Sequence, residues 1–129
     1  MKIMITGIAG FIGMHTALRL NELGHEVFGF DNLNNYYEPL LKKERVACLR
    51  EAGVGFRVGD LRDKLDLTDY VSNTKPDMVI HLAAMAGVRY SMSNAGEYID
   101  TNCHGTLNLI NACEASDIQN VIYASTSCV

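Results

Sequence analysis

The sequence lacks the features that would place the protein in a membrane or on a nucleic acid. No apolar run in the 129 residues reaches the ~18 residues that a membrane-spanning helix needs. Lys and Arg number 11 against 15 Asp and Glu, for a net charge of -4, so no nucleic-acid or anionic-membrane partner is expected. Met1 leads directly into a strand pattern with no signal-peptide pattern, which makes the cytoplasm the expected location.

Metal-binding patterns are missing as well. The cysteines (Cys48, Cys103, Cys113 and Cys128) include no C-x-x-C pair, and the histidines form no metal-binding i, i+4 motif. We therefore expect no metal site and interpret the cysteines as reduced thiols in the core. There is no linker, internal repeat or low-complexity run, and the composition is 48% hydrophobic. One domain with one core is expected.

Short apolar runs alternate with helical patterns along the chain. Strands are expected at Lys2–Thr6, Glu26–Phe30, Gly55–Val58, Met78–Leu82 and Asn120–Ala124. Helices are expected at Phe11–Leu23, capped by Gly24, and at Glu38–Glu51, Arg62–Ser72 and Gly96–Ala115. In the last helix, the positions that fall on one face are Ile99, Cys103, Thr106, Ile110 and Cys113. Continuously apolar strands predict a parallel sheet buried on both faces, and the repeats predict a doubly wound α/β fold of order 3-2-1-4-5.

A glycine motif stands between the first strand and the first helix. Gly7, Gly10 and Gly13 are spaced G-x-x-G-x-x-G. The first glycine permits a tight turn, the second lets backbone N–H groups approach a pyrophosphate, and the third lets the helix pack on the strand. The positive end of the helix dipole then faces the phosphates. With an acidic residue, Asp31, at the end of the second strand, the motif predicts a dinucleotide site.

Small or polar residues also follow the other expected strands, where doubly wound sheets bind ligands. The strand-end residues are Gly7, Asp31, Asp60, Ala83 and the run Ser125-Thr126-Ser127. Asp31 can accept both ribose hydroxyls of an adenosine and would repel the 2′-phosphate of NADP, which favours NAD; alternatively it caps a turn or helix. Asp60 either accepts the adenine amino group or forms the N-cap of the next helix.

Three further features leave alternatives open. Asn102 lies in a helical pattern that Asn disfavours, so it ties the helix to the loop after the fourth strand, lines the site, or is solvated. The small residues of His81-Leu-Ala-Ala84 either admit a cofactor or belong to the core. The hydroxyls at 125–127 either contact a substrate sugar or support an acid/base group, or form a polar turn.

Together these residues resemble the extended short-chain dehydrogenase/reductase superfamily and, within it, the nucleotide-sugar epimerases. The motifs that carry the resemblance are T-G-x-x-G-F-I-G, the Asp after the second strand, G-D-L-R-D, H-L-A-A, the helix Asn and S-T-S. The UDP-glucuronate 4-epimerase subgroup is the most similar, through D-N-L-N-N-Y-Y (31–37), Leu41-Lys42, Arg45 and A-G-V-R-Y-S (86–91). The sequence departs from the subgroup in three places. Met85 stands where Gln is usual, Asn94-Ala95 stands where Asn-Pro is usual, and Cys128 stands where Ser or Thr is common.

The resemblance implies an isomerase that uses NAD to invert C4 of UDP-glucuronate, or of a related UDP-sugar, by transient oxidation to a 4-keto sugar. A dehydratase of the same superfamily and a non-catalytic NAD-binding module are alternatives. The cofactor residues it implies are Gly7, Gly10, Phe11, Ile12, Gly13, Asp31, Asn32, Lys42, Asp60, Leu61, Leu82, Ala83, Ala84 and Asn102. It implies a catalytic Thr126 at the sugar O4 and substrate contacts by Arg89, Ser91, Ser125 and Ser127.

One motif of the family is missing from the chain. No Tyr-x-x-x-Lys, the family's acid/base motif, occurs in the 129 residues. We therefore interpret residues 1–129 as the incomplete NAD-binding Rossmann domain of a longer enzyme, truncated before the last strand and the substrate lobe, and expect it to be inactive alone. The complete enzyme is expected to be a homodimer. The last strand and the last helix are expected to expose apolar surface that missing helices would cover.

Overall fold

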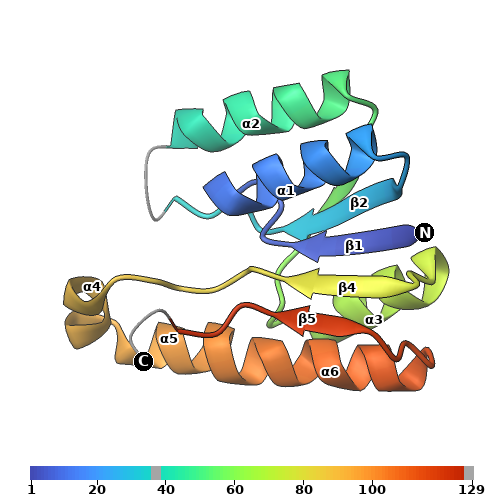
Figure 1. Ribbon diagram of the computed structural model, residues 1–129. Helices are drawn as coiled ribbons and strands as arrows, with labels where there is room; N and C mark the ends of the chain where they lie inside the picture. The colour runs from blue at the N-terminus through green and yellow to red at the C-terminus, as the bar shows by residue number, and fades with distance from the viewer. Residues whose placement is uncertain (36–38, 127–129) are drawn as a thin grey trace.

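A five-stranded parallel sheet with helices on both faces forms the molecule (Figure 1), as a computed structural model of residues 1–35 and 39–126 describes it. The strands are β1 (Lys2–Thr6), β2 (Glu26–Asp31), β3 (Gly55–Val58), β4 (Met78–His81) and β5 (Val121–Tyr123). They lie in the order β3-β2-β1-β4-β5, and every neighbouring pair is parallel. The predicted doubly wound fold and its strand order are confirmed.

Two apolar layers hold the helices on the sheet. The helices α1 (Phe11–Glu22) and α2 (Pro39–Glu51) lie on one face, and α3 (Lys64–Thr74) and α6 (Thr106–Ala115) lie on the other. Successive side chains of a strand point to opposite faces, so Ile3 and Ile5 join the first layer and Met4 joins the second. A continuously apolar β1 is therefore buried on both sides, as its sequence predicts.

Local backbone signals set the helix ends. Gly24 has φ +83° and donates its N–H to the Asn21 carbonyl, while His25 donates to the Leu20 carbonyl. This pattern ends α1 in a left-handed residue and confirms Gly24 as the capping glycine. At the start of α3, the Asp63 carboxylate accepts the N–H groups of Leu65 and Asp66, each at 3.1 Å. The N-cap interpretation of Asp60 is therefore wrong.

The region after β4 differs most from the prediction. A short helix, α4 (Val88–Ser93), precedes the expected helix, which is divided into α5 (Ala95–Tyr98), the π-helix η1 (Ile99–Gly105) and α6. A π-helix has more residues per turn than an α-helix, so the spacing of 3.6 does not hold across it. The expected single face is therefore wrong, because Cys113 is buried while Ile99 and Ile110 are about half exposed.

The cysteine environments and the last strand also correct the prediction. Cys113 is buried, but Cys48 and Cys103 are exposed, and Cys128 lies outside the described residues. In β5, Val121, Ile122 and Tyr123 are 42%, 51% and 55% exposed. Burial on both faces is thus wrong for this strand, whereas the expected exposure of apolar surface is confirmed. The exposed surface includes an apolar groove lined by His81, Thr106, Leu109, Ile110, Val121 and Tyr123.

The Gly13→Ala substitution is expected to destabilise the fold. A Cβ at Gly13 would lie 2.2 Å from the Gly7 carbonyl oxygen and 2.8 Å from Ile8 Cα, both of which are backbone atoms. Overpacking of this kind costs about 1–3 kcal/mol, which thermal unfolding followed by circular dichroism would detect as a lower Tm.

Gly96→Ala is the matched control. In the described part of the chain, no atom beyond the neighbouring residues and its own helix backbone lies within 4 Å of the Cβ it would gain, and alanine stabilises a helix by roughly 0.5–1 kcal/mol relative to glycine. Its Tm should be unchanged or higher. Equal losses of Tm in the two variants would contradict the packing role of Gly13.

Candidate functional site

The glycine turn joins β1, β2 and β4 at the carboxyl end of the sheet. Gly7 has φ +71°, and its N–H donates to the Phe30 carbonyl at 2.8 Å. A Cβ on Gly7 would lie 2.8 Å from the Ala83 nitrogen. The turn therefore needs glycine both for its backbone conformation and for its close approach to the segment after β4.

A cleft opens at the carboxyl ends of β1–β4. Its lining includes ten residues predicted to hold a cofactor, namely Gly7, Gly10, Asp31, Asn32, Lys42, Asp60, Leu61, Leu82, Ala83 and Ala84. It also includes residues that were not predicted to bind the cofactor, namely Phe30, Asn34, Gly59, Met85 and Thr101. The ends of four strands thus meet in one cleft, whereas Ser125 and Thr126, which were also expected at this strand-end site, are not in its lining.

Four predicted cofactor residues lie beside the cleft. Phe11 and Ile12 are exposed in the first turn of α1, and Gly13 packs beneath Gly7. The Asn102 side chain accepts the Met85 N–H at 2.8 Å and donates to the Met85 carbonyl at 2.9 Å. Of the alternatives for Asn102, the tie between the helix and the loop after β4 is therefore confirmed.

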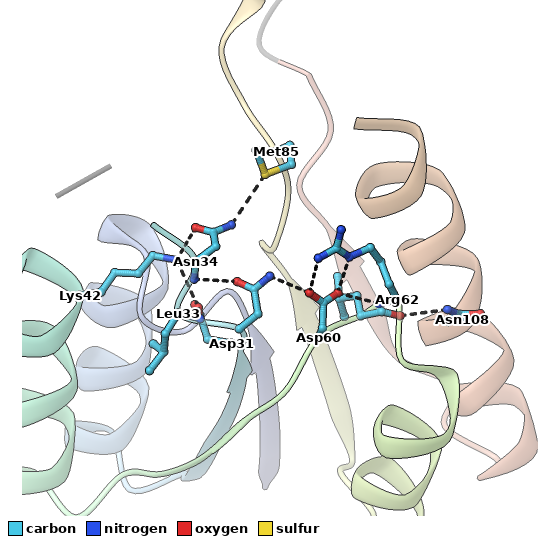
Figure 2. Close-up of polar contacts among 10 residues, drawn as sticks. Asp31, Leu33, Asn34, Lys42, Asp60, Arg62, Met85 and Asn108 are labelled. Atoms are coloured by element: carbon cyan, nitrogen blue, oxygen red, sulfur yellow. Dashed lines mark hydrogen bonds and ion pairs between the residues drawn. The ribbon is translucent and has the colours of Figure 1, made fainter. Parts of the chain in front are cut away.

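A buried ion pair lies at the end of β2 (Figure 2). The Asp31 Oδ1 accepts the Leu33 N–H at 2.8 Å and lies 3.3 Å from the Lys42 ammonium nitrogen. Its Oδ2 accepts the Ala9 N–H at 3.0 Å. A carboxylate has about four acceptor positions, so three of them are used here. The Lys42 contact is the longest of the three.

A second carboxylate, Asp60, is held at the end of β3 by Arg62. The Arg62 backbone N–H and Nε–H both donate to Asp60 Oδ1 at 2.9 Å, and its Nη2 donates to Oδ2 at 2.7 Å. The Asn32 amide donates to the same Oδ2 at 3.0 Å. These bonds, chiefly the one from the Arg62 side chain, lower the pKa of Asp60 to about 2. The carboxylate is therefore ionised at neutral pH.

Asn34 links the two carboxylates into one network across the cleft (Figure 2). Its side-chain oxygen accepts from Lys42 at 3.1 Å, and its backbone N–H donates to the Asn32 side chain at 3.1 Å. Its amide nitrogen also lies 3.7 Å from the Met85 sulfur. The sequence analysis gave Asn34 no role; the signal that could have found it is the N-L-N run after β2, because Asn side chains commonly bond backbone groups two residues away.

His81 braces the exit of β4 rather than lining the cleft. Its Nδ1 lies 2.6 Å from Thr6 Oγ1, its Nε2 lies 2.9 Å from Thr106 Oγ1, and its ring packs 5.5 Å from that of Tyr123. Thr6 Oγ1 in turn accepts the Ala83 N–H at 3.3 Å. Burial lowers the pKa of His81 to about 4, so the ring is neutral at neutral pH.

In the described ranges, none of the residues predicted to contact substrate lines the cleft. Arg89 and Ser91 lie on α4, where the Ser91 hydroxyl donates to the Val88 carbonyl at 2.7 Å. Ser125 and Thr126 follow β5 and are exposed, and Ser127 is outside the described residues.

Over residues 1–35 and 39–126, no helix has the length and apolarity to cross a bilayer. In the same ranges, no cluster of three His, Cys, Asp or Glu could hold a metal.

Comparison with known proteins identifies the class. Residues 3–129 match the model of the NAD dependent epimerase/dehydratase family, so the chain belongs to that family. NAD is the cofactor from which the family takes its name. The chain is 43% identical to protein CapI of Staphylococcus aureus, covering 100% of this chain and 39% of that one. It is 40% identical to UDP-glucuronate 4-epimerase 3 of Arabidopsis thaliana, covering 99% and 30% of the two chains.

Solved structures agree with this assignment. The UDP-glucose-4-epimerase of Stenotrophomonas maltophila, with bound NAD and formylated UDP-arabinopyranose, matches with a TM-score of 0.85 and 27% identity over 100% of this chain and 38% of that one. The Thermus thermophilus UDP-glucose 4-epimerase complex with NAD matches with a TM-score of 0.83 and 34% identity over 98% and 38%. The chain thus spans under two fifths of each of these relatives.

Acid is expected to destabilise the protein through His81. Its pKa of about 4 in the folded state lies below its ordinary value of 6.5, so the unfolded chain binds a proton between these values and the folded chain does not. Stability is therefore complete above 6.5 and falls as the pH falls toward 4. Between about pH 7 and about pH 5 we expect a loss of roughly 2 kcal/mol in the free energy of unfolding, measured with urea.

His81→Asn should be less stable at neutral pH but lose less stability over this interval. The exposed His15→Asn variant should decline as the wild type does. A decline of the same size in His81→Asn and the wild type would show that other groups cause it.

Proposed function

We propose that this chain is the cofactor-binding part of an NAD-dependent nucleotide-sugar epimerase that inverts C4 of UDP-glucuronate, or of a related UDP-sugar, by transient oxidation to a 4-keto sugar. The observation that carries the proposal is the cleft that joins a glycine turn to a buried Asp31. Membership of the epimerase/dehydratase family and relatives named UDP-glucuronate 4-epimerase support the substrate. The proposal includes a cytoplasmic location and a homodimer of the complete enzyme.

The glycine turn fits the pyrophosphate of a dinucleotide. Gly10, which precedes α1, carries no side chain, and no side-chain hydrogen bond caps the helix there. The first N–H groups of a helix without such a cap are available to an anion. A Cβ on Gly10 would lie 3.0 Å from the Gly7 carbonyl oxygen, so any larger residue would crowd the turn. These backbone groups would bind the phosphates.

The end of β2 fits an adenosine ribose. Asp31 has one acceptor position left, and exchange of the 3.3 Å Lys42 contact would provide a second. The carboxylate could then accept both ribose hydroxyls, with Lys42 kept nearby by Asn34. Bound NAD would supply hydride acceptance and return at the sugar C4. The residues of this chain would bind the cofactor and orient it.

The substrate contacts are carried over from the family resemblance. Thr126 would hydrogen-bond the sugar O4, and Ser125 and Ser127 would contact the sugar. Arg89 is exposed on α4, and a guanidinium can bind a carboxylated sugar with two parallel hydrogen bonds. A dehydratase of the same superfamily and a non-catalytic NAD-binding module are the alternative functions, and a test for turnover separates the last from the first two.

Asp31→Asn is expected to weaken NAD binding and to reduce the preference for NAD over NADP. An amide accepts fewer hydrogen bonds from the ribose and does not repel a 2′-phosphate, while Lys42 remains beside it as a cation. We expect roughly tenfold or more weaker NAD binding and a smaller gap between the two cofactors, measured by isothermal titration calorimetry.

Asp69→Asn, an exposed position on α3, is the control and should bind both cofactors as the wild type does. An unchanged ratio of NAD to NADP affinity in Asp31→Asn would contradict the role given to this carboxylate.

The 129-residue chain is expected to bind NAD without converting UDP-glucuronate. It contains no Tyr-x-x-x-Lys, and loss of a general acid/base alone lowers the rate about 10²–10⁴-fold. Proton NMR of UDP-glucuronate incubated with NAD and the purified chain would detect the C4 epimer. Conversion at the rate of an intact enzyme would mean that the acid/base group lies within these residues.

A further inference from the structure

Arg62 stands at the edge of the cleft without a part in the proposed function, beside Asp60, which is expected to accept the adenine amino group of the cofactor. Asp60 lines the cleft, but Arg62 does not. Their side chains are 27% and 44% exposed. Arg62 nevertheless gives three of the four hydrogen bonds that the Asp60 carboxylate accepts, two of them from its guanidinium to the two different carboxylate oxygens. A paired contact of this kind fixes the plane of the carboxylate.

The fourth hydrogen bond has a different character. It comes from the Asn32 amide, which approaches Asp60 Oδ2 from the end of the neighbouring strand at 3.0 Å. With four donors the carboxylate is saturated, so a ligand donor in the cleft must displace one of them. The Asn32 contact is a single bond from a neutral donor, whereas two of the Arg62 contacts come from one cationic guanidinium and reinforce each other. The Asn32 amide is therefore the donor that exchanges.

We propose that Arg62 is a positioning residue for base recognition, which holds the Asp60 carboxylate so that its Oδ2 can exchange the Asn32 amide for the exocyclic amino group of a purine. The inference rests on the proposed function, because it requires that the cleft binds a dinucleotide. An amide NH₂ and a purine amino group are both planar donors, so one can replace the other without rearrangement of the carboxylate. The cleft would then select a 6-aminopurine over a 6-oxopurine.

The selectivity follows from the hydrogen bonds. A 6-oxopurine presents a carbonyl oxygen where the amino group would stand, and that oxygen faces an ionised acceptor. Neither group can then satisfy the other, which penalises the wrong base. In Arg62→Ala the carboxylate loses both guanidinium donors, keeps only the backbone N–H of residue 62 and the Asn32 amide, and can turn toward solvent. The penalty for the oxo base should shrink together with the benefit for the amino base.

The test compares the dissociation constants of NAD and nicotinamide hypoxanthine dinucleotide, measured by calorimetry on the 129-residue chain. We expect the wild type to bind NAD about tenfold more tightly. In Arg62→Ala the ratio should fall at least threefold toward one, mainly through weaker NAD binding. Arg62→Lys, which keeps the charge but not the paired geometry, should give an intermediate ratio.

Arg57→Ala is the matched control. Arg57 pairs with Asp66 and Asp69 on α3, outside the cleft lining, and its removal should leave the base selectivity unchanged. A thermal melt of each variant establishes that it is folded. If Arg62→Ala does not fold, the ratio of the two dissociation constants measured for Arg62→Lys decides the test.

Three outcomes would overturn the inference. If Arg62→Ala weakens both dinucleotides by the same factor, Arg62 has only a structural role. If the wild type binds both equally, Asp60 does not read the amino group, although the proposed function stands. If the wild type binds neither dinucleotide, the proposed function fails and the inference fails with it.

Discussion

At the glycine turn, backbone packs directly against backbone, and the rest of the site depends on this constraint. Gly7 lies against the backbone of Ala83, and α1 approaches so closely that Gly13 has no room for a Cβ beside the Gly7 carbonyl. Since no side chain separates these segments, the ends of β1 and β4 and the start of α1 keep one relative position. The N–H groups at the start of α1 are thereby directed toward the cleft, with Asp31 beside them through Ala9.

This backbone packing also positions the polar side chains that line the cleft. Its two carboxylates each have a cation, Lys42 beside Asp31 and Arg62 beside Asp60, and the amides of Asn32 and Asn34 lie between them. Among the described residues, every buried side-chain nitrogen or oxygen has a hydrogen-bond partner. Apart from the remaining acceptor position of Asp31 and the N–H groups at the start of α1, a ligand therefore binds to these side chains by exchange of hydrogen bonds, and its net gain is smaller than its number of contacts would indicate.

Local sequence patterns were enough to predict the sheet and the position of the cleft, because apolar runs, turn glycines and the handedness of crossovers determine the strand order. Asp31 could be predicted because it stands at a strand end. For Asp60 the sequence left two roles open, because the cap of α3 turned out to be a second carboxylate, Asp63. The role of Asn34 could not be predicted, because it depends on partners from other elements. The helix expected at 96–115 is present, but its expected single face was wrong, because the π-helical part leaves no mark in a search for period 3.6.

The π-helix makes the length of this stretch matter as much as its composition. Within η1, Thr101 lines the cleft and Asn102 pairs with the Met85 backbone, while Leu109 in α6 packs in the core. If η1 kept its number of residues but wound as an α-helix, one end of the stretch would turn against the other by roughly 100°. Related chains could therefore exchange many side chains here, as long as the number of residues and the π-helical winding stay matched, because the cleft contacts would otherwise lose their alignment with the core packing.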